Sequence, residues 1–145
     1  MPVCNETEFK KRLTNMQLPR IAFIFGEEKF LVHHYTDKLS EKAVGKHPSE
    51  FNFHTFDSKS TIDEIAQAAL AVPFMADLLL IKVLDLDVES LSDNQYKKFQ
   101  ELLTIVPSST VLVFSWPTFD IGNKKSAKWK KLVEAVSKTE DGVVF

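Results

Sequence analysis

The sequence predicts an α/β fold in which helices cover both faces of a parallel sheet. Two hydrophobic periods alternate along the chain: short runs that are apolar throughout, and longer runs with an apolar residue every three or four positions. Continuous apolar runs are typical of strands buried on both faces, and strands separated by helices favour parallel pairing. With 145 residues, the chain is long enough for one such domain and its core.

The first helix is expected from Asn5 to Met16. Asn5 and Glu8 have the spacing of a capping box. One face of this helix collects three apolar residues, Phe9, Leu13 and Met16. The run Arg20-Ile-Ala-Phe-Ile-Phe25 follows and predicts a strand buried on both sides.

The second helix is expected from Lys29 to about Ala43, after a turn that begins at Gly26. Its apolar stripe consists of Leu31, Tyr35 and Leu39. Gly45 then supplies the residue type that most often ends a helix. The segment from Phe51 to Phe56 predicts the second strand.

The clearest amphipathic helix opens with Thr61 and Glu64. Its apolar face consists of Ile62, Ile65, Ala66, Ala69 and Leu70. Pro73 is expected to end this helix, because proline cannot continue the backbone hydrogen bonds. The run from Leu78 to Leu84 is too apolar for a half-exposed sheet and predicts the third strand.

The last part of the chain predicts two more helices and two more strands. Ser92 and Gln95 open a helix whose inward residues are Tyr96, Phe99, Leu103 and Val106. The fourth strand is expected at 110–115 and a fifth at 142–145. Between them, a lysine-rich helix is expected, whose inward-facing residues are Trp129, Leu132, Val133 and Val136. Because the chain stops on an apolar strand, we expect a domain boundary there.

Composition narrows the functional classes. The net charge is −2, so no broad basic field marks an autonomous nucleic-acid binder. Cys4 is the single cysteine, which excludes an intrachain disulfide and a zinc site of paired cysteines. No apolar run approaches the ~20 residues that span a bilayer, which predicts a cytoplasmic protein with no membrane partner. The histidines lack the spacing of metal ligands: His33, His34, His47 and His54.

The turn Gly26-Glu27-Glu28-Lys29 stands where a phosphate-binding loop would lie. Such a loop needs a second glycine, followed by a lysine and a hydroxyl residue in succession. Neither the second glycine nor the lysine–hydroxyl pair is present here. Glu27 and Glu28 would repel phosphate, whereas at a helix N-terminus they interact favourably with the dipole. We therefore expect no nucleotide, no cofactor and no catalysis here, with an ATP-hydrolysing P-loop domain as the first alternative.

Acidic residues provide the second alternative. Asp85 and Asp87 follow the third expected strand, where many ATPases carry a magnesium-binding acid. Together, Glu27, Glu28, Asp85 and Ser115 resemble the acid pocket of a receiver domain, because the carboxyl ends of parallel strands share a crevice. A phosphoacceptor would also need a lysine after the fifth strand, which would lie beyond residue 145.

Six lysines of the expected lysine-rich helix form a basic face. Such a face either contacts DNA phosphates or is simply the solvated side of the helix. These lysines are Lys124, Lys125, Lys128, Lys130, Lys131 and Lys138.

The segment Leu70-Ala-Val72-Pro73-Phe74-Met75 has more apolar surface than the buried stripe of its helix requires. In one interpretation, Phe74 and Met75 pack under the edge of the sheet. In the other, they are exposed and insert into a pocket of a partner protein, as aromatic and methionine-rich patches do.

Several segments, in order and spacing, resemble the N-terminal domain of the delta subunit of bacterial DNA polymerase III, a component of the clamp loader. The resemblance extends over nearly the whole chain. It is carried by Ile21-Ala-Phe-Ile-Phe-Gly-Glu-Glu-Lys-Phe-Leu31, Glu50-Phe-Asn-Phe-His-Thr-Phe-Asp57, Pro73-Phe74 before an apolar strand, and Pro107-Ser-Ser-Thr-Val-Leu-Val-Phe114.

This resemblance implies a three-layer RecA-like domain of the AAA+ type, with a five-stranded parallel sheet and a degenerate P-loop at Gly26. It implies no catalysis by the domain, although the domain belongs to the polymerase holoenzyme. The family's delta subunit binds the sliding clamp (the beta subunit) and holds the ring open for loading onto primed DNA. Its contact is an apolar pair, typically Leu-Phe, which falls here on Pro73 and Phe74, flanked by Val72 and Met75. Pro73 departs from that pattern.

Residues 1–145 then correspond to a single N-terminal clamp-binding domain. The family's lid domain and C-terminal collar are absent, and the resemblance assigns contacts with the other clamp-loader subunits to that missing C-terminal region. DNA would be reached through the assembled loader in the bacterial cytoplasm. We expect the 145-residue chain to be a monomer, because no heptad repeat or long edge strand supplies another interface.

Overall fold

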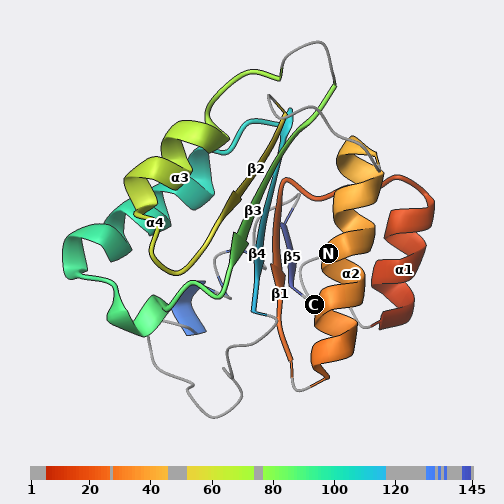
Figure 1. Ribbon diagram of the computed structural model, residues 1–145, viewed down its shortest axis with the longest axis horizontal. Helices are drawn as coiled ribbons and strands as arrows, with labels where there is room; N and C mark the ends of the chain where they lie inside the picture. The colour runs from red at the N-terminus through yellow and green to blue at the C-terminus, as the bar shows by residue number, and fades with distance from the viewer. Residues whose placement is uncertain are drawn as a thin grey trace.

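The computed structural model describes residues 6–26, 28–45, 52–73, 77–116, 130–132, 134, 136 and 142–144. In this part of the chain, a parallel sheet lies between two pairs of helices (Figure 1). Helices α1 (Glu6–Thr14) and α2 (Lys29–Val44) cover one face, and α3 (Ile62–Ala69) and α4 (Asp93–Ile105) cover the other. The predicted α/β class, a parallel sheet with helices, is confirmed.

The first strand in the chain lies inside the sheet. Strand β1 (Ile21–Ile24) pairs with β4 (Thr110–Ser115), β4 pairs with β3 (Leu79–Leu84), and β3 pairs with the edge strand β2 (Phe53–Phe56). On its other side, β1 pairs with a short segment, β5 (Gly142–Val144). Every pairing is parallel, so the turns that follow β1, β3 and β4 lie along the same edge of the sheet.

The strands contribute side chains to two hydrophobic cores, one on each face of the sheet, because successive side chains point to opposite faces. From β1, Ile21 and Phe23 pack toward α3 and α4, whereas Ala22 and Ile24 pack toward α1 and α2. All four are fully buried, as the continuous apolar run predicted. The core beside α3 and α4 is centred on four aromatic rings, whose contacting pairs have centroids 4.9 to 6.4 Å apart: Phe23, Phe99, Phe114 and Trp116.

Hydroxyl caps start the two helices on that face. The Thr61 side chain accepts a hydrogen bond from the Glu64 backbone N–H, and Ser92 accepts one from the Gln95 N–H, each at 3.2 Å. Both predicted helix starts are therefore confirmed. Gln95 also accepts the Ile62 backbone N–H at 3.0 Å, which ties α4 to the first turn of α3. The corresponding prediction for α1 involves Asn5, which lies outside the described residues.

The prediction that Met16 packs beside Phe9 and Leu13 is wrong. Helix α1 ends at Thr14, and Met16 leaves it in a left-handed conformation with φ +56° and a side chain that is 56% exposed. Two backbone hydrogen bonds close this end, from Met16 to the Leu13 carbonyl and from Gln17 to the Arg12 carbonyl. This is the Schellman arrangement, which turns the chain away from the apolar face.

Other element boundaries differ from the predictions by a few residues. Helix α3 ends at Ala69, so Pro73 lies four residues beyond its end and does not terminate it. Leu70 is 44% exposed and does not belong to the buried face. Tyr96 of α4 is half-buried at the margin of the core. In each case, the side-chain pattern identifies the element but not the tertiary contacts that fix its ends.

Near the C-terminus, Leu132 and Val136 are buried, as predicted. Trp129, Val133 and Phe145 lie outside the residues whose side chains the structure describes. Within the described ranges, no helix is long and apolar enough to span a membrane.

Candidate functional site

The chain leaves α3 at a point fixed inside the protein. Thr110, the first residue of β4, donates a hydrogen bond from its hydroxyl to the Ala69 carbonyl at 2.9 Å, and both residues are fully buried. The last carbonyls of a helix have no partner within the helix, so this bond satisfies a group that would otherwise lose water without replacement. Strand β4 therefore holds the end of α3 and fixes the direction in which the chain leaves it.

Two apolar side chains just beyond that point face solvent. Val72 is 84% exposed and Leu70 is 44% exposed, whereas Pro73 is half-buried. Phe74 and Met75, the other members of the predicted contact segment, lie outside the described residues. Val72 and Leu70 thus add exposed apolar surface beside a helix end that a buried hydrogen bond holds.

The lysine that follows the turn after β1, Lys29, contacts the backbone just after β4. Gly26 has φ +151°, a conformation that favours glycine. Glu28 is the N-terminal cap residue of α2 and makes no side-chain capping bond. The Lys29 ammonium donates to the Trp116 carbonyl at 3.4 Å, just after β4. Glu27 lies outside the described residues, so the degenerate P-loop stays a prediction.

Ser115 and Asp85 lie close together at the ends of β4 and β3. The Asp85 N–H donates to the Ser115 carbonyl at 2.8 Å, and Asp85 has φ +57°. The Ser115 hydroxyl, however, is fully buried and lies 2.7 Å from the Thr36 hydroxyl on α2. Ser115 thus joins α2 to the sheet, which does not suit the open phosphate pocket of a receiver domain.

The acid at position 87 has a local structural role. Its carboxylate accepts a hydrogen bond from the Ser90 hydroxyl at 2.5 Å, across a single turn of 3-10 helix, η1 (Val88–Ser90). Trp116 stabilises the same region, because its fully buried indole N–H donates to the Leu86 carbonyl at 2.7 Å. Sequence reasoning did not single out Trp116. The only signal was a tryptophan directly after an apolar strand.

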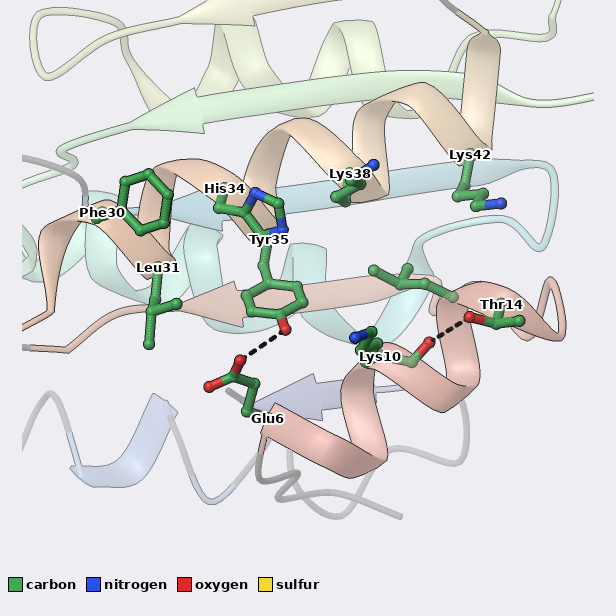
Figure 2. A pocket seen from close by; sticks show the side chains of 10 residues that line it. Glu6, Lys10, Thr14, Phe30, Leu31, His34, Tyr35, Lys38 and Lys42 are labelled. Carbon is green, nitrogen blue, oxygen red and sulfur yellow. Dashed lines mark hydrogen bonds between the residues drawn. The ribbon is translucent and has the colours of Figure 1, made fainter.

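A groove of about 380 Å³ lies between α1 and α2 (Figure 2). Sequence reasoning missed this groove, because its shape depends on how the two helices pack. Four of its lining residues lie along one side of α2: Phe30, His34, Lys38 and Lys42. On the α1 side, the groove is lined by Glu6, Lys10, Leu13 and Thr14.

A hydrogen bond crosses this groove and links its two helices. The Tyr35 hydroxyl donates to a carboxylate oxygen of Glu6 at 3.0 Å (Figure 2), and the Tyr35 ring packs 5.7 Å from that of Phe9. Burial raises the pKa of Tyr35 above its ordinary value, and the hydrogen bond and negative charge of Glu6 raise it further. The neutral phenol is therefore the form that holds α1 against α2.

The histidines do not gather into a metal site in the described part of the chain. His33 is exposed, His34 lines the groove, and His54 lies in β2. Within the described residues, no group of three or more His, Cys, Asp or Glu side chains is placed to hold a metal ion. His47 and four of the six predicted basic-face lysines lie outside these residues, and the other two, Lys130 and Lys131, are exposed.

Similar structures share this arrangement of helices and strands. The DNA clamp loader delta protein of Bacillus subtilis superposes with a TM-score of 0.76 at 18% identity, over 96% of this chain and 41% of that protein. A DNA polymerase III gamma subunit-related protein of Thermotoga maritima gives a TM-score of 0.56 at 17% identity, over 73% of this chain and 38% of that one. Identities this low show a common fold, and this chain spans less than half of either protein.

Sequence comparison supplies the family. No curated protein sequence matches the chain. A family model described as DNA polymerase III, delta subunit, however, matches residues 23–140, which is most of the chain. This range includes the second half of β1 and all of β2, β3 and β4. The chain therefore belongs to the DNA polymerase III delta subunit family, as the resemblance of its segments predicted.

Proposed function

We propose that this chain is the clamp-contacting domain of a clamp-loader delta subunit, which binds the sliding clamp and helps to open it for loading onto primed DNA. Family membership and the fold shared with the Bacillus subtilis delta protein support this proposal. The domain is of the RecA-like AAA+ type in this proposal. Because the chain spans 41% of the Bacillus subtilis protein, contacts with other loader subunits are assigned to the rest of the assembly.

The exposure of Val72 carries the proposal. The Val72 side chain is 84% exposed and so contributes almost nothing to the core, although it follows a helix end held by a buried hydrogen bond. A helix end that is held in place reduces the entropy lost when the residues just after it dock, and apolar anchors contribute most when they fill a pocket. We assign the clamp contact to Val72, Pro73, Phe74 and Met75.

The domain works in this proposal without a nucleotide and without catalysis of its own. The Lys29 ammonium donates to the Trp116 carbonyl, and Lys29 lies three residues after Gly26, which is not the lysine position of a phosphate loop. The glycine pattern and hydroxyl residue of a phosphate loop are also missing from the sequence after Gly26. We place the protein in the bacterial cytoplasm, as a monomer when separated from the loader.

Surface plasmon resonance against an immobilised bacterial sliding clamp tests the proposal. Phe74→Ala should weaken binding by tens- to hundreds-fold, and Val72→Ser by at least about 5-fold, as truncated anchors do. The matched control is Phe30→Ser, which alters an exposed apolar residue on α2, across the sheet from α3.

The melting temperature of each variant separates contact from folding. An exposed anchor leaves no cavity when it is shortened, so the folded state should be almost as stable as the original. Unchanged affinity in a folded Phe74→Ala variant would refute the contact. A loss of about 3–5 kcal/mol in stability would instead identify Phe74 as a core residue.

A further inference from the structure

One side of α2 carries an ordered row of side chains. Phe30, His34, Lys38 and Lys42 follow each other at intervals of four residues, so neighbours lie about 6 Å apart along the helix axis. All four line the groove between α1 and α2, and Lys10 lines it from α1 (Figure 2). The row is aromatic at the N-terminal end of the helix and basic toward its C-terminal end.

The aromatic half presents a flat surface. Phe30 is 75% exposed, although burial of its ring would normally stabilise the fold. Its ring lies nearly parallel to the imidazole of His34, with an interplanar angle of 14° and centroids 5.9 Å apart. His34 in turn meets the buried ring of Tyr35 edge-on at 5.0 Å. The imidazole thus supports one face of Phe30 and leaves much of the ring open to solvent.

The basic half concentrates positive charge on the same side of α2. Lys38 and Lys42 line the groove, whereas the acids beside them, Asp37 and Glu41, line a separate hollow near β2. Within the described part of the chain, neither of these lysines nor Lys10 forms an ion pair. Glu6 is the carboxylate that lines the groove, and its charge is partly met by the Tyr35 hydroxyl.

We propose that this groove binds single-stranded nucleic acid, with a base stacked on Phe30 and neighbouring phosphates held by Lys38, Lys42 and Lys10. Every base has a flat face, so an exposed ring beside a basic track accepts single strands of any sequence. The turn-by-turn spacing of the lysines suits a chain of evenly spaced phosphates. An acidic peptide would use the lysines but would leave the supported Phe30 ring without a matching partner.

This site differs from the proposed clamp contact. Val72 follows α3 on one face of the sheet, whereas the groove lies over α2 on the other. The net charge of the chain, −2, does not oppose nucleic-acid binding at the groove, because Lys38 and Lys42 line the groove while the neighbouring acids of α2 line a different hollow. One molecule could then contact the clamp and a nearby single strand at the same time.

Fluorescence anisotropy with a labelled oligothymidylate of about 12 nucleotides, at low ionic strength, tests the proposal. Phe30→Ala should weaken binding by about 5- to 150-fold, the value of one base stacked on an aromatic ring. Lys38→Glu with Lys42→Glu should weaken it further and reduce the salt dependence, log Kd against log salt, by about 1.4, or 0.7 for each phosphate contact. Lys97→Glu makes the same kind of charge change on α4 and should leave the affinity almost unchanged.

Two further ligands decide the outcome. An oligonucleotide of the same length without bases should bind through the lysines and be insensitive to Phe30→Ala. A labelled polyglutamate peptide should bind more weakly than the oligothymidylate. The proposal is wrong if the original chain does not bind the oligothymidylate, if Lys97→Glu weakens it as much as the groove variants, or if polyglutamate binds as tightly.

Discussion

The buried hydroxyl pair between α2 and β4 gives a sharp stability prediction. Thr36 donates to the Val32 carbonyl at 2.6 Å and lies 2.7 Å from the Ser115 hydroxyl. A hydroxyl has one proton, so Thr36 must accept from Ser115. Removing each partner therefore has a different effect, although the two side chains share one contact.

The magnitudes follow from which atom loses its partner. Thr36→Val strands the buried Ser115 proton and should cost about 1–3 kcal/mol, the penalty for an unsatisfied buried donor. Ser115→Ala leaves the Thr36 bond to Val32 intact and should cost only about 0.5–1.5 kcal/mol, the net value of one hydrogen bond. The double variant should cost less than the sum by about 1 kcal/mol, because no stranded group remains.

Urea unfolding of the original chain, both single variants and the double variant measures this cycle. The denaturant slope must stay constant, so that the midpoint reports stability alone. Additive single effects would show that the two hydroxyls do not interact. A larger cost for Ser115→Ala than for Thr36→Val would show that the assigned direction of the hydrogen bond is reversed.

Two further predictions concern the end of α1 and the hydrogen bond that joins α1 to α2. Met16→Gly should stabilise the chain by about 1 kcal/mol, raising the melting temperature, because glycine adopts φ +56° without strain and the methionine side chain is mostly exposed; a lower melting temperature would contradict this. The pKa of Tyr35 is raised in the fold, so its stabilising effect is complete below pH 10.0 and is lost as pH rises through the higher folded pKa. The free energy of unfolding, measured from pH 9 to 12, should therefore decline more steeply for the original chain than for Tyr35→Phe. Parallel profiles for the two proteins would refute the assignment.

The strands and most helix starts could be predicted because they depend on local pattern. The apolar run at 20–25 has to be buried on both faces, and Ile21–Ile24 are all buried in the structure. Thr61 and Ser92 cap their helices, because a hydroxyl three residues before a Glu or Gln provides the bond within one turn. Such features require no knowledge of the rest of the fold.

Features that depend on distant parts of the chain were missed. Leu70 fits the apolar stripe of α3, but Thr110 binds the Ala69 carbonyl from 41 residues away, and the helix ends before Leu70 can pack. The groove requires α1 and α2 to lie side by side, and only the spacing from Phe30 to Lys42 hints at it. The clamp contact assigned to Val72 from the family resemblance stays a prediction, since exposure alone does not identify a partner.

The position of β1 has a consequence for the order in which the protein folds. Strand β1 pairs with β4, about ninety residues later, and with β5, still further along. During synthesis, β1 and α2 therefore emerge long before either strand partner exists, whereas β2, α3 and β3 form a nearly local unit within residues 53–84. We expect this unit to assemble first and the sheet to close when β1 inserts beside β4, a slow step that leaves an apolar strand vulnerable to aggregation until then.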